Sequence, residues 1–141
     1  MPSISSEISL KISSLLKSMG KVTEDTLNEA KKKHDGNGEV PLGILHYLLE
    51  DEKITEDDIV AAISRNYALR KVQLTEQTVK KDALAKFPSE FIVENEIIPF
   101  ELLGKILKVA IFDPAKSVLA SKMKSMTGCN IELYVAKPSN I

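Results

Sequence analysis

The chain has 141 residues, 43% of them hydrophobic and 28% charged, which is the composition of an ordinary folded domain. Its 19 Lys and Arg residues are balanced by 20 Asp and Glu residues, and this balance gives no electrostatic footprint for nucleic acid, whose binding depends on clustered cations. No apolar stretch approaches about 20 residues and no secretory signal is visible, so direct insertion into a membrane is not expected. A single Cys129 permits no internal disulfide, which fits a cytoplasmic location.

The first part of the chain carries the signals of successive amphipathic helices. Apolar residues spaced three and four apart over residues 5–19 predict the first helix, which Gly20 closes. Thr23 predicts the start of a second helix, because a hydroxyl can accept a hydrogen bond from an unpaired amide of the first turn. That helix is expected to run into the basic residues 31–33. The sequence HDGNGEVP at 34–41 then predicts a turn.

Two segments of this first part repeat each other. A third apolar helical stripe covers residues 42–49, and Thr55 with Asp58 predicts the start of a fourth helix by a near relative of the capping box. Residues 14–30 and 47–62 share the order Leu-Leu, polar link, Val or Ile, Thr-Glu-Asp, apolar residue and Ala. The repeat predicts two tandem helix–turn–helix units that pair into one helical lobe.

The predicted fold class is α+β, with a helical lobe at 1–66 followed by an α/β lobe at 67–141 that has a ββαβ core. The pattern changes at this boundary, and residues 72–74 favour a short extended piece. Helical spacing returns at 79–87, and Pro88 predicts a new short helix because proline is tolerated at a first helical position.

Residues 96–112 predict two strands joined near Leu103-Gly104, and Pro99 indicates that the first strand lies at the edge of its sheet. A helix follows at 114–128, and alternating apolar residues at 130–136 predict the last strand. The residues expected on the buried face of that helix are Val118, Leu119, Met123 and Met126.

The sequence carries no recognisable catalytic or metal-binding set. Its six glycines form neither a P-loop nor a dinucleotide-binding fingerprint. His34 and His46 lack neighbouring Cys, Asp or Glu residues at the spacing of metal ligands. The acidic residues 50–52 and 56–58 surround a helix–helix turn and are interpreted as a solvated acidic corner. We therefore expect no enzyme and no metal.

Asp113 is the one residue for which catalysis competes with a structural role. It follows a buried apolar run and precedes Pro114, as catalytic acids at strand ends often do. The same pattern is typical of a helix cap with proline at the first helical position, the side chain accepting an amide of the first turn. Because no His, Lys or Ser is placed as a catalytic partner, we favour the cap.

Taken in order, the motifs resemble the N-terminal domain of the type II secretion and type IV pilus assembly ATPases. The helical segments Leu15 to Ala30 and Leu42 to Ile63 echo the family's helical pattern, so nearly the whole chain is covered. In the later part, the matching residues are Phe87-Pro88, Ile98-Pro99, Leu107, Val109, Ala110, Asp113-Pro114, Thr127-Gly128 and Val135-Ala136.

The resemblance implies a non-catalytic cytoplasmic adaptor or regulatory domain. In the family this domain precedes the motor and docks it onto the cytoplasmic part of an inner-membrane platform protein. The implied partner is therefore that platform protein or a motor ATPase. The motor is not among these 141 residues, and the sequence leaves open a stand-alone regulator or a fragment of a longer ATPase.

MshE-type members of the family bind cyclic di-GMP through tandem motifs resembling R-L-G-x-x-L-L-x-x-G-x-I-x-x-x-x-L-x-x-x-L-x-x-Q. Arginine offers planar donors to guanine or phosphate, leucines cover the purine faces, and glycine permits close backbone approach. Here Pro41 replaces the Arg, Glu52 the later Gly and Asn66 the final Gln, while His34 takes the Gln position of the first repeat. The alternative function is therefore a cyclic di-GMP sensor. Apart from cyclic di-GMP, we expect no cofactor. Its candidate binding residues are Leu42, Gly43, Ile59, Ile63 and Asn66.

Overall fold

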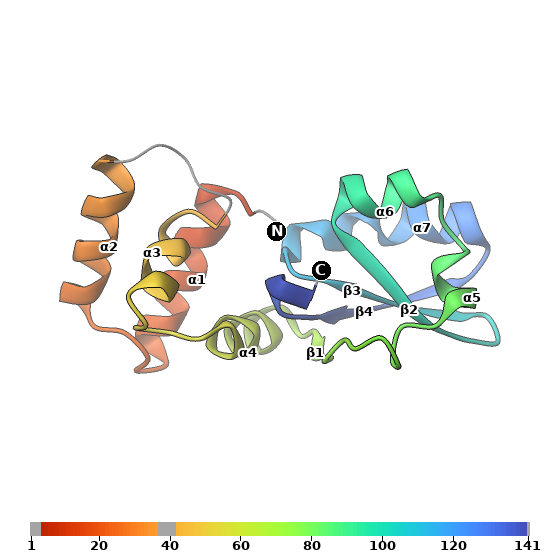
Figure 1. The fold of residues 1–141 in the computed structure, drawn as a ribbon, viewed down its shortest axis with the longest axis horizontal. Coiled ribbons are helices and arrows are strands. Elements are labelled where there is room, and N and C mark those ends of the chain that lie inside the picture. Colours follow the sequence, from red (N-terminus) through yellow and green to blue (C-terminus); the bar gives the residue numbers. More distant parts are fainter. Residues whose placement is uncertain (1–3, 37–41, 141) are drawn as a thin grey trace.

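The protein has two lobes in a computed structural model that describes residues 4–36 and 42–140 (Figure 1). Helices α1 to α4 form a helical lobe, and all later elements form a sheet lobe, so the α+β class is confirmed. The elements in chain order are α1 (Ser6–Ser18), α2 (Glu24–Gly36), α3 (Ile44–Glu50), α4 (Glu56–Tyr67), β1 (Arg70–Lys71), α5 (Lys81–Leu84), α6 (Ser89–Asn95), β2 (Ile97–Leu103), β3 (Ile106–Ile111), the 3₁₀ helix η1 (Pro114–Leu119), α7 (Ala120–Thr127), β4 (Asn130–Val135) and the 3₁₀ helix η2 (Pro138–Asn140).

Several helix ends in the helical lobe lie at the residues that the local signals predicted. Thr55 and Asp58 form a reciprocal capping box at the start of α4, each side chain accepting the other residue's backbone N–H. At the start of α2, the Thr23 hydroxyl accepts a hydrogen bond from the Thr26 amide at 3.2 Å. Gly20, with a φ of 76°, provides the left-handed residue that ends α1.

The turn expected at 34–41 begins later than predicted. His34 and the two residues after it belong to the last turn of α2, which extends through Gly36. Residues 37–41, including Pro41, lie outside the described residues, so the rest of the predicted turn and the Arg-to-Pro replacement have no structural description here.

The sheet has four strands in the order β1-β4-β3-β2. Strands β2 and β3 form the predicted antiparallel hairpin, and β4 runs parallel to both β3 and β1. Pro99 lies in β2 at the edge of the sheet, as its lack of an amide donor required. The register between β2 and β3 shifts by one residue between Pro99 and Glu101, which is a β-bulge.

Each face of the sheet has its own apolar layer. Helices α6 and α7 cover one face (Figure 1), where fully buried Leu107, Val109 and Met123 belong to one cluster. On the opposite face, the segment 72–80 passes beneath the strands, and Leu74 packs with residues of β2, β3 and β4. That segment reaches the β2 edge, where the Lys80 amide donates to the Phe100 carbonyl at 2.9 Å.

The helix predicted at 114–128 is two elements, and two of its expected buried residues are wrong. The chain forms η1 before α7, and a 3₁₀ helix turns every three residues instead of every 3.6. The face predicted from α-helical spacing is therefore not continuous. Met123 is completely buried and Leu119 packs against the same cluster, but Val118 is 80% exposed and Met126 42% exposed.

Three smaller differences also follow from tertiary structure. The helical spacing at 79–87 yields only the short helix α5, and Pro88 caps α6 from outside instead of occupying its first helical position. The extended piece expected at 72–74 is preceded by a strand, β1, that the sequence did not predict. This strand has two residues and exists because Arg70 and Lys71 pair with Tyr134 and Val135 of β4.

The two lobes share a core. Phe112 and Val135 of the sheet lobe are completely buried in the same apolar cluster as the residues of α1 to α4. The last described residues add polar bonds to the start of α4, because Ser139 donates through its amide and hydroxyl to the Glu56 carboxylate at 3.0 and 2.7 Å. An ion pair of 3.2 Å between Lys137 and Asp57 lies beside them.

Candidate functional site

Three of the five residues predicted for cyclic di-GMP lie in the core of the helical lobe. Leu42, Ile59 and Ile63 are almost or completely without solvent exposure. A side chain that is surrounded by the protein's own apolar groups has no surface to offer a ligand. In this conformation these residues pack the helices together.

Gly43 is also buried, and its lack of a side chain has a structural cause. Its φ is 56°, and a Cβ built on it would lie 3.0 Å from the hydroxyl oxygen of Ser9 in α1. That hydroxyl donates to the Leu42 carbonyl at 2.9 Å, which holds the start of α3 against α1. Gly43 also borders a cavity of about 330 Å³, whose other lining residues are Leu10, Lys31, His34, Asp35 and Ile44.

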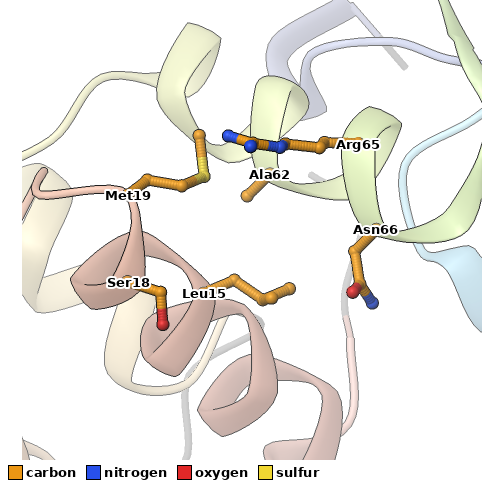
Figure 2. Close-up of a pocket in the computed structure, with 6 residues that line it drawn as sticks. All are labelled: Leu15, Ser18, Met19, Ala62, Arg65 and Asn66. Carbon is orange, nitrogen blue, oxygen red and sulfur yellow. The ribbon is translucent and has the colours of Figure 1, made fainter.

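Asn66, the fifth predicted residue, lines a different cavity. This cavity of about 320 Å³ lies between the C-terminal halves of α1 and α4 (Figure 2). The structure therefore does not bring Asn66 and Gly43 into one site. The residues that line the Asn66 cavity, called the α1–α4 pocket below, are Leu15, Ser18, Met19, Ala62, Arg65 and Asn66.

The α1–α4 pocket combines apolar walls with hydrogen-bond donors. Figure 2 shows the Arg65 side chain extending across the pocket toward Met19, with Leu15 on the opposite side and Asn66 beside it. A guanidinium and an amide together can donate to phosphate or to the edge of a base, and the apolar side chains suit the face of a flat ring. No described carboxylate forms an ion pair with Arg65, so its charge is not neutralised within the described part of the chain.

Sequence reasoning missed Arg65. The family motif places its arginine at the start of each repeat, where Pro41 stands in the second repeat. The signal that was available is the position of Arg65 directly before Asn66, near the end of a helix. Glu52, which replaces the later glycine of the motif, is not among the residues that line this pocket.

In the acidic corner predicted at 50–52 and 56–58, three of the six carboxylates form ion pairs with lysines from elsewhere in the chain. Asp51 pairs with Lys33 of α2, and Asp58 pairs with Lys21 at 3.5 Å. The hydrogen bond to Asp51 raises the pKa of Lys33. These pairs hold the helices at fixed distances and leave no cluster of three metal-ligating side chains among the residues that the structure describes.

Asp113 is a helix cap, as predicted. Its carboxylate accepts a hydrogen bond from the Ala115 amide at 2.9 Å, and Pro114 is the first residue of η1. Burial raises the pKa of Asp113, although the bond from Ala115 and the charge of Lys116 oppose that shift. The charge of Glu96 adds to the upward shift, but the hydrogen bonds described for Asp113 join it to no nucleophile, so its geometry is that of a cap.

Solved structures first define the class of domain. A structure of MshE with cdg covers 92% of this chain and is itself covered to 91%, with a TM-score of 0.71 and 18% sequence identity. The N-terminal domain of XpsE covers 99% of the chain and is covered to 93%, with a TM-score of 0.58 and 20% identity. At these sequence identities the likeness shows only that the chain shares the fold of these two structures.

Sequence comparison then places the chain. The type IV pilus assembly ATPase PilB of Myxococcus xanthus (strain DK1622) is 26% identical over 120 residues, which is 85% of this chain. The matched part is 21% of that protein, so the chain spans about a fifth of its length. The MshEN domain family matches residues 67–141, which is more than half of the chain. The chain belongs to the MshEN domain family and is an N-terminal domain of the type II secretion and type IV pilus ATPases.

Across residues 4–36 and 42–140, no helix is both long enough and apolar enough to cross a membrane.

Proposed function

We propose that this domain is a non-catalytic cytoplasmic adaptor of secretion or type IV pilus machinery. Its partner is the cytoplasmic domain of an inner-membrane platform protein or a motor ATPase. The observation that carries the proposal is the match to PilB over 85% of a chain that contains no phosphate-binding loop of its own. A domain that accompanies a motor without doing its chemistry serves to connect or regulate it.

The contact between the two lobes supports an adaptor that acts as one unit. Phe112 and Val135 insert into the core of the helical lobe, and the bonds from Ser139 to Glu56 reinforce that contact. A shared apolar core resists independent movement of its two parts. A partner that binds one lobe therefore also positions the other.

The direct test is binding of the purified chain to two purified candidates from the same genome. These are the cytoplasmic domain of the inner-membrane platform protein and the motor ATPase. Saturable binding to either one, measured by biolayer interferometry, supports the proposal. Absence of binding to both, together with turnover of a substrate by the chain alone, contradicts it.

A second candidate function is binding of cyclic di-GMP in the α1–α4 pocket. The observation that favours it is the position of the Arg65 guanidinium beside Asn66 in the pocket. This guanidinium is a planar hydrogen-bond donor, which the chain lacks at the arginine position of the motif. The pocket's volume, about 320 Å³, lies at the low end of ligand sites, so part of a dinucleotide would remain outside it. Calorimetric titration of the chain with cyclic di-GMP tests this function.

A further inference from the structure

Four of the six residues of strand β4 have no neighbouring strand on their outer side. In the strand order β1-β4-β3-β2, β4 is flanked by β3 along its whole length. On the other side, β1 pairs only with Tyr134 and Val135. Within the described residues, the stretch 130–133 is therefore an open sheet edge, which we call the β4 edge.

The hydrogen bonds of β4 identify the backbone groups that face outward at the β4 edge. The amides of Asn130 and Ala136 both donate toward β3, to the carbonyls of Lys105 and Ile111. The carbonyl of Val135, by contrast, accepts from Val72 on the outer side. Because backbone groups alternate along a strand, the amides of Ile131 and Leu133 point outward, away from β3.

The side chains around this edge form a hollow between α7 and β4. It measures about 230 Å³ and is lined by Ala120, Ser121, Lys124, Asn130 and Ile131. Ile131 and Leu133 are only partly buried, whereas Leu107 and Val109 on the neighbouring strand are completely buried. The apolar layer under α7 is thus incomplete on the side where a strand is missing.

The charges at the edge indicate what occupies it. Lys124 lines the hollow and Lys105 lies next to Asn130, and neither forms an ion pair with a described carboxylate. On the opposite face of β4, the Glu132 carboxylate is engaged by the Tyr134 hydroxyl at 2.7 Å. An added strand therefore fits if the side chains on its face toward α7 are apolar or acidic. The side chains on its other face, toward Glu132, must not be acidic.

A second copy of this chain fits the edge poorly. Pairing two β4 edges brings Lys124 near its own counterpart and Glu132 near its own counterpart. Like charges that oppose each other across paired strands are destabilising. A different chain with the complementary charge meets no such penalty.

We propose that the β4 edge is the docking site of an extended, acidic–apolar segment of the partner protein, which adds to the sheet as a strand. The inference rests on the proposed adaptor function and names the surface that performs it. Main-chain hydrogen bonds to Ile131 and Leu133 hold such a segment, and the hollow beside Lys124 selects its side chains.

The test compares two lysine reversals in binding to the purified cytoplasmic domain of the platform protein. Lys124→Glu should weaken binding by at least about tenfold, because it places a like charge against the acidic segment. Lys122→Glu is the matched control, since Lys122 lies on the same exposed helix but over the Phe91 ring, 5.5 Å from its centroid. It should change binding by less than about twofold. Equal effects of the two reversals, with the wild-type chain still binding, overturn the docking site and leave the adaptor function standing.

Amide hydrogen exchange, followed by NMR with and without the platform domain, gives an independent readout. The amides of Ile131 and Leu133 should exchange rapidly in the free chain and become protected in the complex, while Asn130 is protected in both. The proposal is overturned in favour of a second copy if two results occur together. The amides of Ile131 and Leu133 are protected in the free chain to a degree that increases with protein concentration, and analytical ultracentrifugation shows a dimer. If the platform domain does not bind the wild-type chain, the adaptor function with this partner fails, and the docking site is overturned with it.

Discussion

Gly20 and Glu52 occupy the same position in the two helical repeats. Each lies two residues after a helix ends and has a left-handed backbone, with φ values of 76° and 56°. The two helix ends also form the same pair of backbone hydrogen bonds. The Gly20 amide donates to the Lys17 carbonyl, as the Glu52 amide does to the Leu49 carbonyl. The amides of the next residues, Lys21 and Lys53, donate to the carbonyls of Leu16 and Leu48. The two helix ends are thus matching Schellman motifs, one with glycine and one with a side chain that strains the backbone.

We expect Glu52→Gly to stabilise the chain by about 0.5–1 kcal/mol. Glycine adopts the left-handed region without the penalty that a Cβ incurs, and part of that gain is lost to the greater entropy of the unfolded chain. Urea unfolding measures the change in the free energy of unfolding. Glu52→Ala is the control, since it removes the charge but keeps the strained backbone. A stabilisation by Glu52→Ala as large as that of Glu52→Gly would assign the effect to charge instead.

The raised pKa of Asp113 predicts a pH-dependent stability. Burial, and to a smaller extent the charge of Glu96, disfavour the ionised carboxylate in the folded state relative to the unfolded chain. The stability from this group is therefore complete below the ordinary pKa of an aspartate and is lost as the pH rises through the folded-state pKa. Asp113→Asn keeps an oxygen for the Ala115 amide and carries no charge, so its advantage over the wild type should grow between about pH 3.5 and pH 7.

Urea unfolding at each pH, with Asp113→Ala alongside, separates the cap from the charge. The alanine variant lacks both, so it should be less stable than Asp113→Asn by about 1 kcal/mol at every pH. An advantage of Asp113→Asn that does not change with pH, or that shrinks as pH rises, would contradict the burial argument.

The second candidate function predicts that the chain's two arginines differ in cyclic di-GMP binding. Arg65 lines the α1–α4 pocket, whereas Arg70 is exposed in β1. Arg65→Ala should weaken binding by about 10-fold to 100-fold, the worth of a charge-assisted hydrogen bond to phosphate. Arg70→Ala removes the same charge elsewhere and should leave the Kd within about twofold. Calorimetry that gives equal losses for both variants would remove the pocket from consideration.

Phe112→Ala should destabilise both lobes together, by about 3–5 kcal/mol, because it opens a cavity in the core that they share. Circular dichroism of the helices and tyrosine fluorescence should show one common, lowered midpoint in urea. Val118→Ala provides the control, since Val118 is exposed and its loss should change stability by less than about 0.5 kcal/mol. A helical signal that keeps its wild-type midpoint in Phe112→Ala would show that the helical lobe unfolds independently.

The sequence by itself determined the local structure of this protein. The Thr55 capping box, the left-handed Gly20 and the cap at Asp113 were all predictable. Each depends on hydrogen bonds or dihedral angles within a few consecutive residues, where the side chains involved are adjacent in the sequence. The order of such signals was also sufficient to predict the α+β class.

Only the tertiary structure decided what the surfaces offer. Strand β1 exists through its pairing with β4, and the outward position of Val118 depends on a 3₁₀ turn that apolar spacing does not reveal. The pocket that joins Leu15 to Arg65 requires α1 to pack beside α4. The site prediction chose motif positions such as Ile59, which packing buries. Burial and cavities depend on contacts between residues far apart in the chain, and one sequence carries no direct signal for those contacts.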